Sequence, residues 1–266
     1  MATPTELKQQ ADAFRCAGRG DRAIPRYKEA YTLFLEGEEP AEASECQHML
    51  GVSLIFEARY TEGVEALKQA LRERNDQHRV VDGARVLRDL AIAEMLERHY
   101  LNALEFFLRS RNVLVTTDNF GERGITESKL GRLYSLTGEF SLVDECFDEA
   151  YQLIGKAVHP TYQIASHIDN AIACLERAQF GHLDNHLAQA WRILEETEEI
   201  KHQIRRVVQI YVLQIRSAIN KGEWSTARNV YNTRFRDCIE GISPGGKAGL
   251  DKELQISELP QLLSLP

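Results

Sequence analysis

Apolar and small residues recur along this chain at an interval of forty residues. One copy of the pattern has an aromatic residue, a small residue three positions later, a large apolar residue four positions further on, and a second small residue after three more: Tyr60, Gly63, Leu67 and Ala70. The second position of the pattern recurs at Ala23, Gly63, Ala103, Val143, Leu183 and Ala227. The first four steps are forty residues each and the last is forty-four, which predicts an internal structural repeat.

Each copy of the pattern predicts two amphipathic helices joined by a short turn. A partner position stands twelve residues before each of those anchors: Ala11, Gly51, Ala91, Gly131, Ala171 and Ile215. Spacings of three, four and seven place the marked residues on one face of a helix. Small residues on both helices let the two axes approach closely, and the larger residues fill the space beside them. No strand-like alternation interrupts the pattern, so we expect an all-α chain whose helix pairs stack on one another.

These residues resemble the tetratricopeptide repeat (TPR). The resemblance rests on Leu50-Gly51 and Leu130-Gly131 in the first helix, on the aromatic residue that opens the second, and on the small–large–small pattern within it. It covers about residues 5–240 and implies a right-handed α-solenoid of about six helix-turn-helix pairs. The forty-residue period exceeds the usual unit of about 34 residues, which is typical of the longer-repeat subgroup.

Two residues depart from the TPR pattern. Pro25 lies inside the expected second helix of the first pair, where we expect it to kink the helix or delay its start. Arg234 stands in the sixth pair where a small residue is expected. The second departure favours a terminal capping repeat with one face toward solvent.

The C-terminal segment has a different composition. Residues 241–249, GISPGGKAG, predict a flexible linker between the solenoid of residues 1–240 and an apolar tail at 250–266. Two interpretations of the tail stay open: a packed or disordered end, and a segment that docks in a groove of this chain or of a neighbour. We expect it to cap the last helix or to mediate self-association.

Composition narrows the class of protein without naming an activity. The 32 basic and 40 acidic residues give a net charge of −8, which disfavours nucleic acid as a partner because such binding depends on phosphate neutralisation. No apolar run reaches the roughly 18–20 residues of a membrane span, and residues 1–10 lack the apolar core of a signal peptide. Five scattered cysteines without a C-x-x-C pair favour a reducing compartment. We expect a cytoplasmic protein.

Motifs that could carry chemistry are incomplete. Residues 241–247 read G-x-x-x-x-G-K, but Ala248 stands where a phosphate-binding loop needs Ser or Thr. His182 and His186 share a helical face, yet no third metal ligand is near in sequence. We therefore expect no cofactor, no metal and no catalysis. A metal-dependent enzyme using these two histidines stays an alternative, and an RNA-binding repeat is a weaker one.

The TPR resemblance implies that the first helix of each pair lines a groove. Counting from the small anchors, the candidate groove residues are Lys8, His48, Arg85, Arg88, Ile92, Met95 and Arg132. Arginine suits bidentate recognition of a carboxylate or phosphate, so a protein or peptide with acidic groups is the expected partner. The competing interpretation is that these arginines pair with local acids such as Asp89 or Glu127.

The sequence thus predicts a non-catalytic scaffold that binds a protein or peptide. The alternative is a peptide-responsive regulator that acts through a partner. Some TPR proteins hold a C-terminal carboxylate with a fixed Lys/Asn/Asn/Lys/Arg clamp. Asp12 and Met49 occupy the asparagine positions of that clamp here, which disfavours a receptor of this kind.

Overall fold

The computed structural model of the chain describes residues 2–157, 159–198 and 202–264, and these ranges contain helices and turns but no strand. The chain divides into two compact units. The first unit comprises residues 1–116 and 241–253, and the second comprises residues 117–240 and 254–266. The two units are described separately below.

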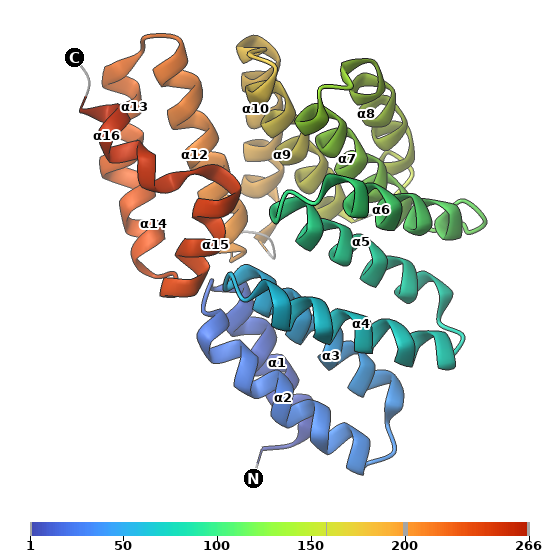
Figure 1. The fold of residues 1–266 in the computed structure, drawn as a ribbon. Helices are drawn as coiled ribbons and strands as arrows, with labels where there is room; N and C mark the ends of the chain where they lie inside the picture. Colours follow the sequence, from blue (N-terminus) through green and yellow to red (C-terminus); the bar gives the residue numbers. More distant parts are fainter. Residues whose placement is uncertain (1, 158, 199–201, 265–266) are drawn as a thin grey trace. The chain divides into compact units, whose positions relative to one another are not determined.

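In each unit the helices are paired as consecutive first and second helices (Figure 1). The first unit contains α1 (Pro4–Cys16), α2 (Gly20–Glu36), α3 (Pro40–Phe56), α4 (Tyr60–Asp76), α5 (Val80–Leu96), α6 (Tyr100–Leu114) and most of α15 (Pro244–Leu254). The second unit contains α7 (Phe120–Thr137), α8 (Phe140–Ile154), α9 (Pro160–Glu176), α10 (Phe180–Glu196), α12 (Ile204–Asn220), α13 (Trp224–Val230), η1 (Tyr231–Phe235), α14 (Arg236–Glu240), η2 (Ile256–Glu258) and α16 (Leu259–Leu263). The predicted all-α fold of about six helix pairs is confirmed.

The forty-residue period consists of two nearly equal halves. From Gly20 to Phe180 a helix begins every twenty residues, and most of these helices are 15–18 residues long with a short link between them. In many links the residue two before the next helix has a left-handed backbone, as Ala58 does at φ 59°. The following N–H then bonds back five residues, as Arg59 N–H does to the Leu54 carbonyl at 2.9 Å. Long helices joined by tight links explain why the repeat exceeds the usual TPR length.

Small residues at the predicted anchors bring the paired helices together. A Cβ placed on Gly51 of α3 would lie 2.7 Å from Leu67 and 3.1 Å from the carbonyl oxygen of Gly63 in α4. A Cβ on Gly131 of α7 would lie 2.9 Å from the ring of Phe147 in α8. The glycines are therefore required by close helix packing, as the pattern predicts.

The structure contradicts one of the two effects expected of Pro25, a delayed start of the helix, and the other, a kink, stays a prediction. Helix α2 starts at Gly20, five residues before the proline, so the start is not delayed. Pro25 is exposed within the helix, and its missing N–H leaves the bond to the Asp21 carbonyl unmade. The apolar face of α2 is buried both before the proline, at Ala23, and after it, at Tyr27 and Phe34, and this burial offsets the cost of the lost bond.

The sixth helix pair departs from the regular pattern in two ways. The four residues that lengthen the last step fall between the end of α10 and the start of α12 at Ile204. The second helix is interrupted by the π-helical turn η1, which separates α13 from α14. Both irregularities belong to the helices that surround the cavity described below.

The segment expected to be a flexible linker forms a helix instead. Helix α15 begins at Pro244, and its glycines lie against the end of α3: a Cβ on Gly249 would overlap the Phe56 carbonyl oxygen. Ser243 donates one hydrogen bond to Glu57 and another from its N–H to the Gly18 carbonyl at 3.0 Å. The expectation was wrong because glycine here serves close packing as well as flexibility.

The described part of the tail contacts helices of its own chain. In the second unit, Arg228 of α13 donates to the Leu263 carbonyl of α16 at 3.0 Å. Arg216 of α12 donates to the carbonyls of Leu254 and Gln255 at 3.1 and 3.0 Å. Leu259 and Leu263 are buried. These contacts cover the end of the sixth pair, and self-association through the tail stays a prediction.

Candidate binding surfaces

Polar pairs join successive first helices in the first unit. Lys8 of α1 forms an ion pair with Glu42 of α3 at 2.6 Å. His48 of α3 lies 2.7 Å from Asp89 of α5, joining His Nε2 to a carboxylate oxygen. The side chain of His48 is only 1% exposed. Two of the predicted groove residues therefore hold neighbouring helices in register.

The His48–Asp89 pair has a defined charge balance. Burial alone would raise the pKa of Asp89, but the hydrogen bond from His48 and the positive charge of Arg88 outweigh it and lower that pKa to about 2. Arg88 Nε lies 3.7 Å from the same carboxyl group. Burial also lowers the pKa of His48, against the opposing effect of Asp89. Asp89 therefore stays ionised and accepts contacts from both neighbours.

The other predicted groove residues of the first unit lie on α5. Arg85 is half-buried and lies 3.4 Å from Asp82, one turn earlier. Ile92 is half-buried against the cluster that contains Val86 and Leu90, whereas Met95 is only 3% exposed. Lys8, Arg85 and Ile92 thus reach the surface more than His48 and Met95 do.

A second polar row runs along α7 and α9 in the second unit. Lys129 forms a 2.7 Å ion pair with Asp169, and Arg132 Nη1 lies 3.8 Å from the same oxygen. The side chain of Arg132 is 5% exposed and that of Asp169 is 2% exposed. Ser128 donates to Ser166 across the same helices at 2.7 Å. The predicted residue Arg132 is a buried member of this row, and the forty-residue separation of Lys129 and Asp169 is the sequence signal for the row.

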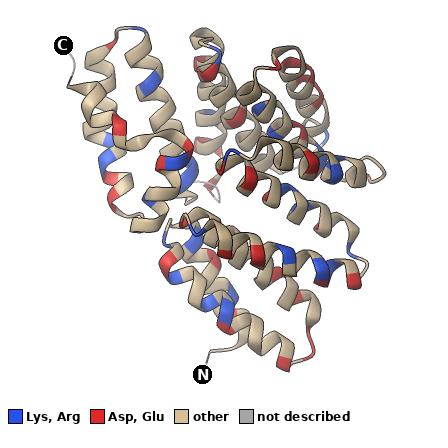
Figure 2. Cartoon of the chain, in the orientation of Figure 1, with Lys and Arg blue, Asp and Glu red and all other residues tan. Residues whose placement is uncertain are grey.

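The cations of both rows have carboxylates beside them. For Arg88 the carboxylate is Asp89, one of the local acids named in the alternative interpretation of the sequence. Figure 2 shows basic and acidic residues intermixed along the helices of each unit. Each row therefore presents paired charges rather than an accumulation of one sign.

A partly buried cluster of Tyr151, His167 and His186 contains one of the two candidate metal ligands. The Tyr151 hydroxyl lies 3.4 Å from His167 Nδ1 and 3.2 Å from His186 Nδ1, and Asn170 donates to it at 3.1 Å. Burial and the positive charge of His186 lower the pKa of His167 to about 4. His182 is exposed. Across the described ranges, no three His, Cys, Asp or Glu side chains are grouped to hold a metal ion.

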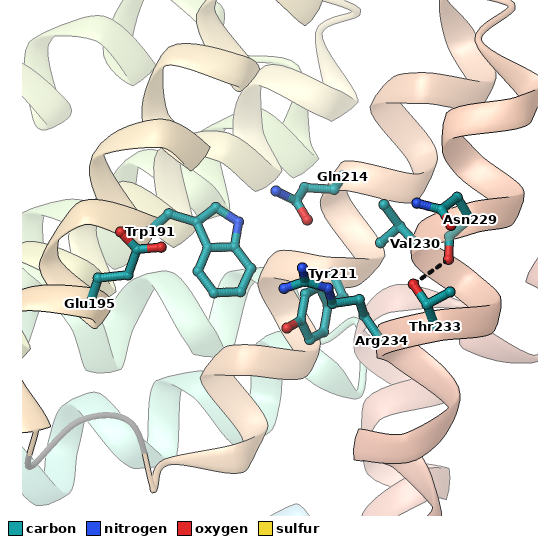
Figure 3. A pocket seen from close by; sticks show the side chains of 8 residues that line it. All are labelled: Trp191, Glu195, Tyr211, Gln214, Asn229, Val230, Thr233 and Arg234. Carbon is teal, nitrogen blue, oxygen red and sulfur yellow. Dashed lines mark hydrogen bonds between the residues drawn. The ribbon is translucent and has the colours of Figure 1, made fainter.

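A cavity of about 350 Å³ lies between α10, α12 and the α13–η1 helix of the second unit. Figure 3 shows the side chains that line it: Trp191, Glu195, Tyr211, Gln214, Asn229, Val230, Thr233 and Arg234. The rings of Trp191 and Tyr211 are 5.2 Å apart and tilted by 49°. The sequence prediction missed this cavity. The lengthened last step and the unexpected Arg234 are the two signals that could have located it.

No family model matches the chain, and no curated protein matches it. Solved structures match at low sequence identity. A Rap protein complexed with Competence and Sporulation Factor superposes with a TM-score of 0.69 at 13% identity, over 89% of this chain and 63% of the Rap chain. The Rap conjugation gene regulator of plasmid pLS20, complexed with the Phr* peptide, superposes with a TM-score of 0.63 at 15% identity, over 98% of this chain and 65% of the regulator chain. Nearly identical TPR-like repeats of a putative kinesin light chain from Podosopora anserina superpose with a TM-score of 0.52 at 18% identity, over 75% of this chain and 99% of the matched chain.

These matches define the fold: the chain is a TPR-type helical repeat protein. It spans less than two thirds of either Rap chain. In the part of the chain that the structure describes, no helix has both the length and the apolar character needed to cross a membrane.

Proposed function

We propose that this protein is a non-catalytic scaffold that binds a peptide or an extended protein segment along the face of its first helices. The observation that carries the proposal is the likeness, over 98% of this chain, to a Rap structure in complex with the Phr* peptide, together with the likeness, over 89%, to a Rap protein complexed with Competence and Sporulation Factor. The free cysteines, three of them buried, suit a reducing cytoplasmic compartment. At the identity observed, the peptide-bound state of those proteins is a guide for experiment.

The rows of polar pairs give this surface a rigid set of contact groups. Lys8, Arg85 and Arg88 are held by Glu42, Asp82 and Asp89, so their side chains lose little freedom when a ligand binds. A peptide carboxylate would have to compete with the existing acidic partner of each cation. The ligand we propose therefore makes backbone and apolar contacts beside Ile92, with acidic groups as an added preference.

The second candidate is a regulator whose shape responds to a peptide and which acts through a partner protein. The matched protein of plasmid pLS20 is a gene regulator in complex with a peptide, and this observation favours the candidate. Because stacked repeats contact only their neighbours, small changes at each interface add along a solenoid. Small-angle scattering with and without peptide separates the two candidates: a peptide-dependent change in radius of gyration favours the regulator.

The experiment selects short random peptides displayed on phage against the purified full chain. The affinity of the best synthetic peptide is then measured for wild type and for Arg85→Gln/Arg88→Gln. We expect about tenfold weaker binding to the variant, which corresponds to about 1.4 kcal/mol. The matched control is Arg72→Gln/Arg109→Gln, which removes the same charge from exposed positions on the second helices α4 and α6.

Equal helicity and equal melting temperature of the two variants are required before affinities are compared. Selection of no peptide above background on the wild-type chain would contradict the scaffold proposal. A peptide that loses equal affinity in both variants, or in neither, would place its site away from the first helices of the first unit.

A further inference from the structure

Several polar groups that lack a partner within the protein lie around the cavity of the second unit. The indole Nε1–H of Trp191 is shielded from solvent and makes no hydrogen bond. Arg234 and Glu195 also line this cavity; both residues are exposed to solvent, and neither forms an ion pair with any residue in the described ranges. A buried donor without an acceptor costs roughly 1–3 kcal/mol. This cavity therefore differs from the first-helix rows, where each cation has a carboxylate beside it.

The π-helical turn η1 explains why an arginine reaches the cavity. In a regular helix, the residue seven after Ala227 faces the core, which is why the repeat pattern expects a small residue there. The wider turn adds one residue, so the buried position falls at Phe235, which is 4% exposed, while Arg234 is exposed. Figure 3 shows Arg234, Gln214 and Trp191 around the same space.

The size and the walls of the cavity restrict its ligand. A volume of about 350 Å³ is at the small end of ligand pockets, which span roughly 300–1,000 Å³. Trp191 and Tyr211 form an aromatic wall that suits a flat ring in an offset or tilted arrangement. Arg234 suits a carboxylate, and Glu195 suits an ammonium group.

We propose that this cavity binds a small zwitterion with an aromatic ring, that is, a free aromatic amino acid. The ring packs on Trp191 and Tyr211. The carboxylate pairs with Arg234, and the ammonium group pairs with Glu195. Most of the lining residues belong to the second helices α10 and α13–η1, and none of them is among the residues on which the peptide proposal rests, so this inference does not depend on the proposed function.

The test uses isothermal titration calorimetry of the full chain with three probes. L-phenylalanine carries both charges, 3-phenylpropionate lacks the ammonium group, and phenethylamine lacks the carboxylate. We expect L-phenylalanine to bind most tightly. Arg234→Gln should weaken L-phenylalanine and 3-phenylpropionate about tenfold and leave phenethylamine unchanged. Glu195→Gln should weaken L-phenylalanine and phenethylamine and leave 3-phenylpropionate unchanged.

The matched control is Arg236→Gln, which removes an exposed arginine two residues away that does not line the cavity. It should leave all three affinities unchanged. Absence of binding by every probe at millimolar concentration would overturn the proposal, as would equal effects of Arg234→Gln and Arg236→Gln. Binding of N-acetyl-L-phenylalanine as tightly as L-phenylalanine would also overturn it, because that result would indicate the C-terminal residue of a peptide.

Discussion

The first-helix rows and the cavity of the sixth pair use the same kinds of residue in opposite ways. In the rows, Arg88 has an acidic partner in the next residue, Asp89, and Arg132 has one on the next first helix, Asp169. Around the cavity, Arg234 and Glu195 have no ionic partner among the residues described. The rows follow the regular repeat, whereas the cavity occurs where the repeat is lengthened and its second helix contains a π turn.

This difference separates polar residues that stabilise the fold from polar residues available to a ligand. Charges repeated at a forty-residue interval meet on adjacent helices and neutralise one another, so they set the register of stacking. A departure from the repeat leaves its polar groups without those partners. The predictions below test this distinction, from the largest expected effect to the smallest.

Removing a buried cation that pairs with a carboxylate of the neighbouring helix should destabilise the fold strongly. Arg74 of α4 is fully buried, pairs with Glu45 of α3 and donates to the Asp82 carbonyl of α5 at 2.7 Å. Arg74→Ala leaves the half-buried carboxylate of Glu45 without its partner and removes a fully buried side chain, so we expect a loss of about 3–5 kcal/mol in urea unfolding. Arg234→Ala should change stability by less than about 0.5 kcal/mol.

The double variant Glu45→Leu/Arg74→Met is the control for Arg74. It replaces both charges with apolar groups and should recover most of the lost stability. Equal costs for Arg74→Ala and Arg234→Ala would remove the distinction between charges that are paired within the fold and charges that line the cavity.

The partly buried cluster around His167 predicts a loss of stability on mild acidification. His167 has a pKa of about 4 in the folded chain against 6.5 for the free group. The unfolded chain therefore binds a proton below pH 6.5 that the folded chain does not bind until about pH 4. Stability is complete above pH 6.5 and falls by roughly 2–3 kcal/mol as the pH is lowered through that window.

Urea unfolding measured at several values between about pH 7 and pH 5 checks this prediction. His167→Gln should flatten the pH dependence, whereas His78→Gln, which changes an exposed residue of the first unit, should leave it as in wild type. The same slope in all three proteins would show that His167 is not the titrating group.

Close helix packing predicts opposite outcomes for two glycine-to-alanine substitutions. Gly51→Ala places a methyl group 2.7 Å from Leu67, so we expect a loss of about 1–3 kcal/mol. Gly181 of α10 has no atom within 4 Å of an added Cβ, and Gly181→Ala should stabilise the chain by up to about 1 kcal/mol. Differential scanning calorimetry gives both values, and a stabilised Gly51→Ala would contradict the packing account.

The links between helices predict the smallest effects. Ala58 holds a left-handed backbone at φ 59°, and Gly138 occupies the corresponding position of a later link at φ 81°. Ala58→Gly should stabilise the first unit by about 0.5–1 kcal/mol, and Gly138→Ala should destabilise the second by about 1 kcal/mol. Melting temperatures should therefore shift in opposite directions, and shifts of the same sign would contradict the assigned backbone conformation.

Much of the fold could be predicted because its cause is local and periodic. The spacings around Gly63, Ala103 and Phe147 indicate helices, their paired faces and the close approach of their axes. The twenty-residue half-period was missed because the left-handed link residues include Glu38, Ala58 and His78, which carry no glycine signal. Here the packing of the flanking helices outweighs the local backbone preference.

The candidate site was less predictable than the fold. Counting along the first helices located Arg85, Arg88 and Arg132, but it gave no information on burial, and His48 and Met95 are buried. The linker expected at 241–249 became helix α15 because Gly249 fits where the Phe56 carbonyl leaves no room for a side chain.

The sequence by itself determined the helical period, the anchors of each pair and the TPR-type fold, because these depend on residues within one repeat. Only the tertiary structure decided which polar residues neutralise one another, where the C-terminal segment packs and where polar groups surround a cavity. Those outcomes depend on side chains such as Lys129 and Asp169, which lie forty residues apart and meet only after the helices stack. Contacts between repeats decide which partner a polar side chain has and how deeply it is buried. The periodic pattern of a single repeat contains neither piece of information.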